Sequence, residues 1–178
     1  KVQATSTSTP TRTRTASPTP TRTAIESSAA TLAGAVDLEG RPDKPSDCWA
    51  VPVSITFLWS DGSVAHVVPL NTTSYGEFVI PDLPPGLYDV RIKNPLTLAN
   101  YKQAVDLQPG LNQIDFGTLL PGDCSNDNVV DVLDFSLLRA AFGTSEPTAD
   151  FNDDGIVDVF DFSLLRANFG MSGDIFID

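Results

Sequence analysis

The sequence predicts a mainly β protein with a small α-helical part, built from three consecutive segments. Residues 29–120 consist of short runs in which apolar and polar residues alternate, a pattern typical of a β-sandwich. Residues 121–178 contain an acidic segment that occurs twice, each time followed by an apolar pattern of helical period. Residues 1–28 are rich in Thr, Ser, Pro and Arg. We therefore expect an extended N-terminal segment, a seven-stranded antiparallel Greek-key β-sandwich and a two-helix acidic module.

The N-terminal segment has a two-residue alternation, because every odd position from Thr5 to Thr23 is Thr or Ser. Pro10, Pro18 and Pro20 occupy even positions, so in a β-strand the N–H groups that they lack would all lie along one edge. The segment can therefore pair with the sheet edge of another subunit. It can equally be an extended stalk with O-linked glycans, and the sequence leaves both alternatives open. The residues expected at a strand contact include Thr5, Thr7, Thr9, Thr11, Thr13 and Thr15.

The β-sandwich is clearest in the run VPVSITFLW, where alternate residues from Val51 to Trp59 are apolar. Further strands are expected in AHVVPL, EFVI, LYDVRIK and NQIDF, with SDG, PDLPPG and QPG as turns. The stretches LAGAVDLEGRP, GEFVIPDLPPGLYDVRI and GLNQIDFGTLL resemble the carboxypeptidase regulatory-like, or prealbumin-like, β-sandwich domains. This resemblance implies a spacer or adhesion unit without catalytic residues.

Composition limits the partners and the location of the chain. From Pro121 onward, twelve acidic residues face two basic ones, which argues against nucleic acid and favours a hard cation. No run approaches the roughly 18 apolar residues that a membrane-spanning helix needs. Lys1 in place of an initiator Met indicates a processed chain, and we expect it to be secreted, extracellular or at the cell surface. In such a protein Cys48 and Cys124 are expected to form a disulfide, with two free thiols as the alternative.

The acidic repeat consists of DCSNDNVVDVLDFSLLRAAFG and DFNDDGIVDVFDFSLLRANFG, which are identical at 14 of 21 positions. Read as a twelve-residue loop, each copy has oxygen donors at positions 1, 3, 5, 9 and 12, the spacing that surrounds Ca²⁺ with roughly six to eight oxygens. Position 7 offers its backbone carbonyl, and position 6 must turn sharply, as Gly155 does readily and Asn128 tolerates. We therefore predict two Ca²⁺ ions. The predicted ligands are Asp123, Ser125, Asp127, Val129, Asp131 and Asp134 in loop 1 (residues 123–134), and Asp150, Asn152, Asp154, Ile156, Asp158 and Asp161 in loop 2 (residues 150–161).

Each loop is followed by the pattern DFSLLRAxFG, which places apolar residues at helical spacing before a terminal Gly. No helix-forming sequence precedes either loop, so each copy is half of an EF-hand. The duplicated half unit at residues 122–170 resembles a dockerin module, the calcium-dependent domain that binds a cohesin domain in cellulosome-type assemblies. The resemblance implies a cohesin-like partner.

In that family, positions 10 and 11 of each loop select the cohesin and are commonly Ser and Thr. Here they are hydrophobic, so either they contact a different partner surface or they pack against the chain's own sandwich. Arg139 and Arg166 are either partner contacts or surface charges near the helix ends. The hydrophobic residues at these positions are Val132, Leu133, Val159 and Phe160.

We expect the chain to be non-catalytic. His66 is the only histidine, no catalytic triad or phosphate-binding loop can be assembled, and most clustered acids are assigned to the two loops. Two functions remain. In the one we favour, the chain is a calcium-rigidified subunit that self-associates into surface filaments through its N-terminal segment. In the alternative, it is a dockerin-type anchoring module with a glycosylated stalk. In both, chelation of calcium should unfold the last third of the chain first.

Overall fold

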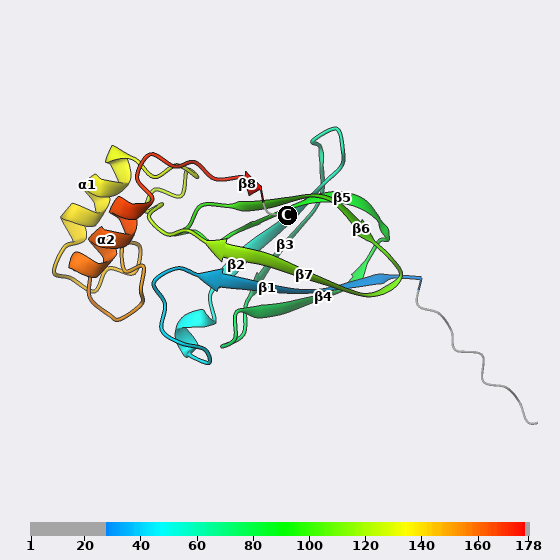
Figure 1. The fold of residues 1–178 in the computed structure, drawn as a ribbon, viewed down its shortest axis with the longest axis horizontal. Coiled ribbons are helices and arrows are strands. Elements are labelled where there is room, and N and C mark those ends of the chain that lie inside the picture. The colour runs from blue at the N-terminus through cyan, green and yellow to red at the C-terminus, as the bar shows by residue number, and fades with distance from the viewer. Residues whose placement is uncertain (1–27, 177–178) are drawn as a thin grey trace, which may run out of the picture.

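A computed structural model describes residues 28–176 as a β-sandwich with a helical module at one end (Figure 1). The Thr and Pro residues predicted to form a donor strand or a stalk lie outside the described residues. The strands are β1 (Ala30–Leu38), β2 (Pro52–Leu58), β3 (Val64–Asn71), β4 (Glu77–Leu83), β5 (Gly86–Lys93), β6 (Asn100–Leu107), β7 (Gly110–Leu119) and β8 (Ile175–Phe176). The helices are a short 3-10 turn, η1 (Asp47–Trp49), and the α-helices α1 (Val132–Ala141) and α2 (Val159–Ala167).

The strands form two sheets, one in the order β4-β1-β7 and the other in the order β3-β2-β5-β6-β8. The predicted sandwich is therefore confirmed, but the expectation of purely antiparallel pairing is wrong. β1 and β7 run parallel from the pair Ala30 and Gly110 to the pair Leu38 and Leu119. Parallel neighbours need a long crossover connection, and residues 39–109 supply it by passing through the second sheet. The Greek-key connection remains a prediction.

Alternate residues along the strands form the core of the sandwich, as the sequence pattern predicted for β2. Val53, Ile55 and Phe57 are buried, whereas Trp59 is 43% exposed. β2 ends at Leu58, so Trp59 already belongs to the turn and its ring lies against Tyr88, with a centroid distance of 4.8 Å.

β6 is absent from the strands that sequence reasoning named. Its apolar and polar residues do not alternate regularly, because Ala104 adopts a positive φ of 54° and the pairing with β5 shifts register between Tyr88 and Val90. Such a bulge inserts an extra residue into the strand. Side chains beyond the bulge therefore face the opposite side of the sheet from the one that simple alternation predicts. A strand of this kind gives no clear two-residue period in the sequence.

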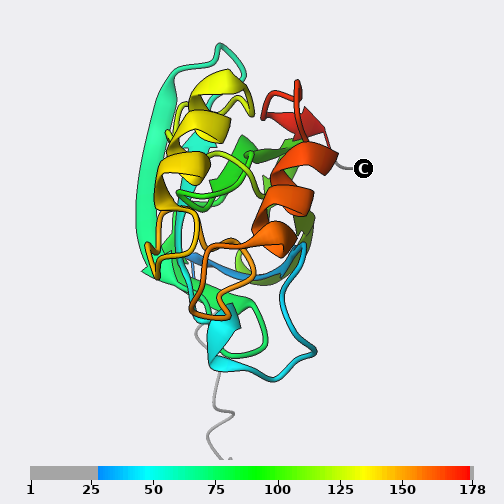
Figure 2. The same ribbon diagram turned by 90° about the vertical axis from the view of Figure 1, so that its left-hand side faces the viewer.

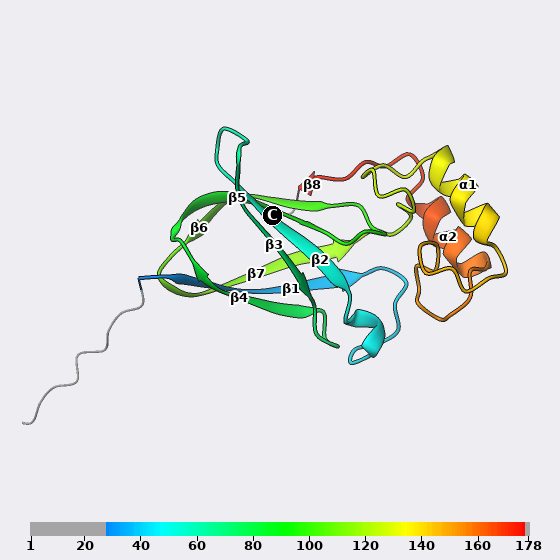
Figure 3. The same cartoon turned by 180° about the vertical axis from the view of Figure 1, so that it is seen from behind.

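The helical module has a hydrophobic core of its own, separate from that of the sandwich. Leu98, which belongs to the connection between β5 and β6, is completely buried in the module core. After α2 the chain returns to the sandwich, where β8 pairs with β6 in parallel. Figures 2 and 3 show both helices at the same end of the sandwich. The module is therefore joined to the sandwich at both of its ends. Along residues 28–176, no helix is long and apolar enough to cross a membrane.

Candidate calcium site

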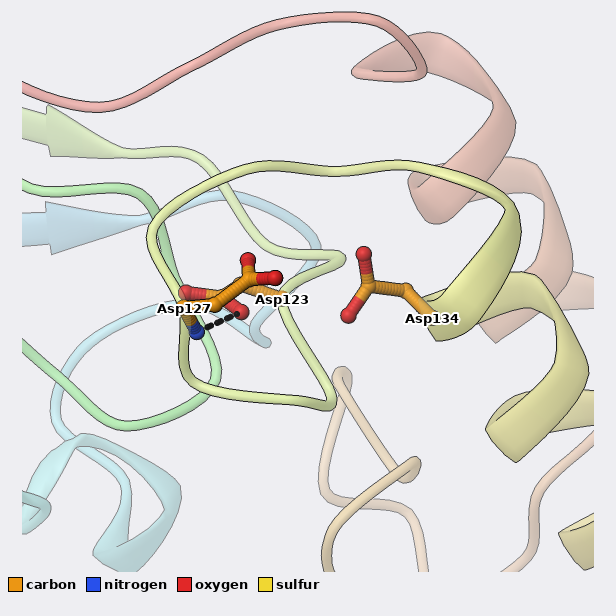
Figure 4. A group of neighbouring side chains, drawn as sticks. All are labelled: Asp123, Asp127 and Asp134. Atoms are coloured by element: carbon orange, nitrogen blue, oxygen red, sulfur yellow. Dashed lines mark hydrogen bonds between the residues drawn. The ribbon is translucent and has the colours of Figure 1, made fainter.

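Loop 1 brings three of its predicted ligands together. Carboxylate oxygens of Asp123, Asp127 and Asp134 lie within 4.8 Å of one another, and Asp123 and Asp134 are completely buried. Figure 4 shows Asp134 facing Asp123 and Asp127 across the loop from the beginning of α1. Residues at positions 1, 5 and 12 thus converge on one point, as a twelve-residue calcium loop requires.

Backbone N–H groups hold these carboxylates in place. Asp123 accepts hydrogen bonds from the N–H groups of Asp127, at 3.0 Å, and of Asn128, at 2.9 Å. Asp134 accepts one from Ser125 at 2.9 Å and one from Asp131 at 2.8 Å. Asp131 caps α1 in turn, so Asp131 and Asp134 form a capping box. The same residues that start the helix therefore orient the ligand at position 12.

Loop 2 repeats these hydrogen bonds, although loop 1 holds the only cluster of three carboxylates within 4.8 Å of one another that the described residues form. Asp150 accepts hydrogen bonds from the N–H groups of Asp154, at 3.2 Å, and of Gly155, at 2.9 Å. Asp161 accepts one from Phe151 at 2.7 Å, and it forms the capping box of α2 with Asp158. Asp161 is completely buried, and Asp150 nearly so. The duplication in the sequence is therefore also a duplication of hydrogen bonds.

Position 6 of each loop makes the predicted sharp turn, and positions 7 and 8 differ in burial. Asn128 and Gly155 have positive φ angles of 72° and 91°, which produce the sharp turn at position 6. The side chains at position 7, Val129 and Ile156, are exposed. Those at position 8, Val130 and Val157, are completely buried in the module core.

Each loop is hydrogen-bonded to the segment that follows the helix of the other half unit. The N–H of Val130 donates to the carbonyl of Met171, which follows α2, at 2.9 Å. In the same way, the N–H of Val157 donates to the carbonyl of Thr144, which follows α1, at 2.8 Å. Each loop therefore pairs with the segment after the other helix, and neither half unit is complete alone.

The electrostatics of the loops fit a hard cation. Each loop has four carboxylates among its predicted ligands, at positions 1, 5, 9 and 12, and two of these four are buried. Burial raises the pKa of Asp161 above its ordinary value. Backbone hydrogen bonds to the carboxylate lower the pKa, but this effect is smaller than that of burial. Buried carboxylates need a partner charge, and Ca²⁺ binds oxygen ligands of this kind. The residues present therefore suit calcium in both loops.

The expected disulfide is not found, because Cys48 and Cys124 are both free thiols. The Sγ of Cys48 lies 3.6 Å from the carbonyl oxygen of Asp153 in loop 2. Cys124 instead packs against the module core, and burial, followed by the charges of nearby carboxylates, raises its pKa to about 12. Each thiol thus has its own surroundings, and the expected extracellular location was not a sufficient reason to pair the two cysteines.

The module residues predicted to contact a partner are exposed. Val132 and Leu133 lie on the first turn of α1 and are 66% and 50% exposed, and Val159 and Phe160 are exposed in the same place on α2. The alternative, that they pack against the sandwich, is therefore not what the structure has. Arg139 and Arg166 are exposed on the last turns of the helices.

An apolar groove of about 180 Å³ lies beside Arg139, and sequence reasoning did not predict it. α1 contributes most of its walls, and Phe162 of α2 closes one side. Phe142, just after α1, is half exposed there. The helical periodicity of DFSLLRAxFG indicated that each helix has an apolar face. It could not show which aromatic rings of that face remain outside the core. The lining residues are Phe135, Leu138, Arg139, Phe142 and Phe162.

Two cations of the sandwich contact the loops and were also missed. Lys93 Nζ lies 2.7 Å from Asp123 Oδ2 in loop 1, and Arg41 Nη1 lies 2.7 Å from Asp153 Oδ2 in loop 2. These pairs join residues that are far apart in the sequence, so no motif or spacing could have indicated them.

Comparison with known proteins agrees with the module geometry. Residues 121–170 match the family model of the dockerin type I domain, which confirms the predicted resemblance of this segment. No curated protein sequence matches the chain.

Two crystal structures of the Coh3ScaB-XDoc complex, interface mutants of a type II Cohesin-X-Dockerin complex from Acetivibrio cellulolyticus, contain a chain of similar fold. The two matches have TM-scores of 0.65 and 0.66 at 19% identity, and each covers 81% of this chain and 97% of that chain. At this identity the likeness shows the fold alone. Its coverage exceeds the sandwich, so the shared fold includes both the sandwich and the module.

Proposed function

We propose that this chain is a non-catalytic, extracellular assembly protein that binds a cohesin-like domain through its helical module in the presence of calcium. The dockerin match at residues 121–170 supports an interaction role. The proposed division of the chain is an N-terminal segment (1–28), a sandwich spacer of prealbumin-like type (29–120) and a dockerin-like module (121–178). The two Ca²⁺ ions are assigned to the predicted ligands of loop 1 and loop 2.

The observation that carries this proposal is the amount of exposed apolar surface on a small module. Contiguous apolar surface on a soluble protein is typical of a site of protein contact. Two of these residues start each helix, at the positions by which the dockerin family selects its cohesin. The exposed large apolar side chains of the module are Val129, Val132, Leu133, Leu137, Phe142, Ile156, Val159, Phe160, Phe169 and Met171.

The sandwich leaves the two helices unequally available. The Leu164 side chain of α2 lies against Gly40 of the sandwich, where a Cβ atom would overlap it. The equivalent residue of α1, Leu137, is 42% exposed. We therefore assign the larger part of the partner contact to α1 and its adjoining groove, with the N-terminal turn of α2 at its border.

The comparisons favour this function over self-association into filaments. The filament hypothesis depends on the N-terminal segment, which lies outside the described residues, whereas the dockerin match falls on the module. In the proposed arrangement the Thr/Ser tract serves as a stalk that carries O-linked glycans.

Binding to a panel of purified type I and type II cohesin domains tests the proposal. The full chain should bind at least one of them in millimolar calcium and lose binding in EDTA, as followed by isothermal titration calorimetry. Val132→Asp should weaken binding by about 100-fold or more, because it would bury an unpaired carboxylate in the interface. Leu111→Asp, at a site on β7 that is 66% exposed, is the matched control. Failure of every cohesin to bind, or equal binding in EDTA, would contradict the proposal.

A further inference from the structure

We propose that Lys93 makes the two calcium sites unequal, so that loop 2 fills at a lower calcium concentration than loop 1. This inference rests on the proposed binding of calcium by both loops. It assigns to a residue of the sandwich, far from either loop in sequence, a role in setting calcium affinity.

Lys93 is fixed where it meets loop 1. Its Nζ donates to Asp123 Oδ2 at 2.7 Å, to the carbonyl of Thr97 at 2.7 Å and to the carbonyl of Asn94 at 3.3 Å. Its side chain is 13% exposed, and that of Asp123 is completely buried. The ammonium group therefore has three acceptors and little contact with water, and all three contacts hold it beside Asp123.

Within residues 28–176, loop 2 has no equivalent cation on its predicted ligands. Asp150 occupies the position of Asp123, but among the described residues no lysine or arginine forms a salt bridge with it or with the other predicted carboxylate ligands of loop 2. Arg41 does contact loop 2, but through Asp153 at position 4, which is not a predicted ligand and whose side chain is 51% exposed. Lys93 therefore offsets one of the four ligand charges in loop 1, while all four remain in loop 2.

This difference in charge affects calcium in two ways. A dication that binds Asp123 must share it with a fixed positive charge in a partly desolvated site, and this repulsion lowers the affinity of loop 1. In the absence of calcium, the same charge compensates the buried carboxylate and reduces repulsion among the ligands of loop 1.

Loop 1 is also attached to the sandwich through Asn128, whose Oδ1 accepts from the N–H of Ala99 at 2.9 Å. Loop 1 should therefore keep its fold at calcium concentrations at which its site is still empty. Loop 2 also contacts the sandwich, through Arg41 and Cys48 at Asp153, but none of the described cations pairs with its predicted ligands, so these ligands depend more strongly on the ion.

A calcium titration of the full chain followed by amide NMR separates the two loops. The N–H groups at position 6, Asn128 and Gly155, each donate to the position 1 carboxylate of their own loop, so their resonances report the two sites individually. We expect the Gly155 resonance to reach its midpoint at a calcium concentration at least about tenfold lower than that of Asn128. Coincident midpoints, or the reverse order, would overturn the proposal without any variant.

Lys93→Met and Lys93→Gln test the cause. Each should lower the calcium midpoint of Asn128 by about tenfold or more and leave that of Gly155 unchanged. Lys44→Met is the control, because it removes another lysine–aspartate pair, with Asp37, which lies on the surface of the sandwich and contacts neither loop. An unchanged Asn128 midpoint in both Lys93 variants, with dispersed spectra at saturating calcium, would refute the role of Lys93. If calcium moved neither resonance in the wild-type protein, the proposed calcium binding itself would fail, which is a different outcome.

Discussion

Truncation of Leu98 should destabilise the helical module far more than the sandwich that carries this residue. Leu98 is completely buried in the module core, although it lies between β5 and β6. Leu→Ala at such a site costs about 2–5 kcal/mol, with larger values where the surroundings cannot collapse. The N–H of Leu98 is bonded to the carbonyl of Leu120 at 2.8 Å, which fixes the backbone around the cavity. We therefore expect a loss of about 3–5 kcal/mol in the free energy of unfolding of the module.

Two spectroscopic signals separate the parts in urea denaturation at saturating calcium. Both tryptophans, Trp49 and Trp59, belong to the sandwich, whereas the two α-helices belong to the module. In Leu98→Ala, the far-UV circular dichroism transition should move to lower urea while the tryptophan fluorescence transition changes little. Leu111→Ala, on the exposed face of β7, should leave both transitions in place. An equal shift of both signals would refute the separation of the two cores, and an unchanged dichroism transition would refute the place of Leu98 in the module.

Three further predictions concern single residues. Asn168→Ala should cost about 1–3 kcal/mol in thermal unfolding, because it removes the side-chain donor that lies 2.9 Å from the buried carbonyl of Pro121; an unchanged melting temperature would contradict this. Gly34→Ala should lower the urea midpoint by an amount equivalent to about 1–3 kcal/mol, since the new Cβ would overlap the Phe78 ring; a rise in the midpoint would show that the ring moves freely. In EDTA, the raised pKa of Asp161 means that the folded module binds a proton more tightly than the unfolded chain. The stability that protonation of Asp161 contributes is lost as pH rises through the folded pKa. The helical dichroism should therefore be stronger at roughly pH 5 than at neutral pH, and the opposite trend would refute this prediction.

Much of the candidate calcium site could be predicted because its information is local. The ligands of each loop lie within twelve consecutive residues, and the capping boxes at Asp131 and Asp158 use the same residues to begin the helices. A twelve-residue spacing therefore encodes both the loop and the position of the helix that follows. The repeat added a second, independent copy of the same pattern.

The joint between sandwich and module could not be predicted in this way. Lys93, Arg41 and Leu98 act on the module only because the sandwich places strand ends and connections beside it. The parallel pairing of β1 with β7 has the same origin, since it depends on a crossover through another sheet. The bulge at Ala104 removed the two-residue period by which β6 would have been recognised. Contacts of this kind arise from topology, whereas sequence periodicity reports only neighbours along one element.

The parallel alignment of β1 and β7 has a mechanical consequence. The chain enters β1 at Ala30, at the end of the sandwich far from the helices, and it leaves β7 at Leu119, where the module begins (Figure 1). A pull between the beginning of β1 and a partner held on the module would draw these two strands in opposite directions along their common axis. Their backbone hydrogen bonds, evenly spaced along a parallel pair, would then carry the tension together and not open one after another. The sandwich is thereby built to transmit force along its length.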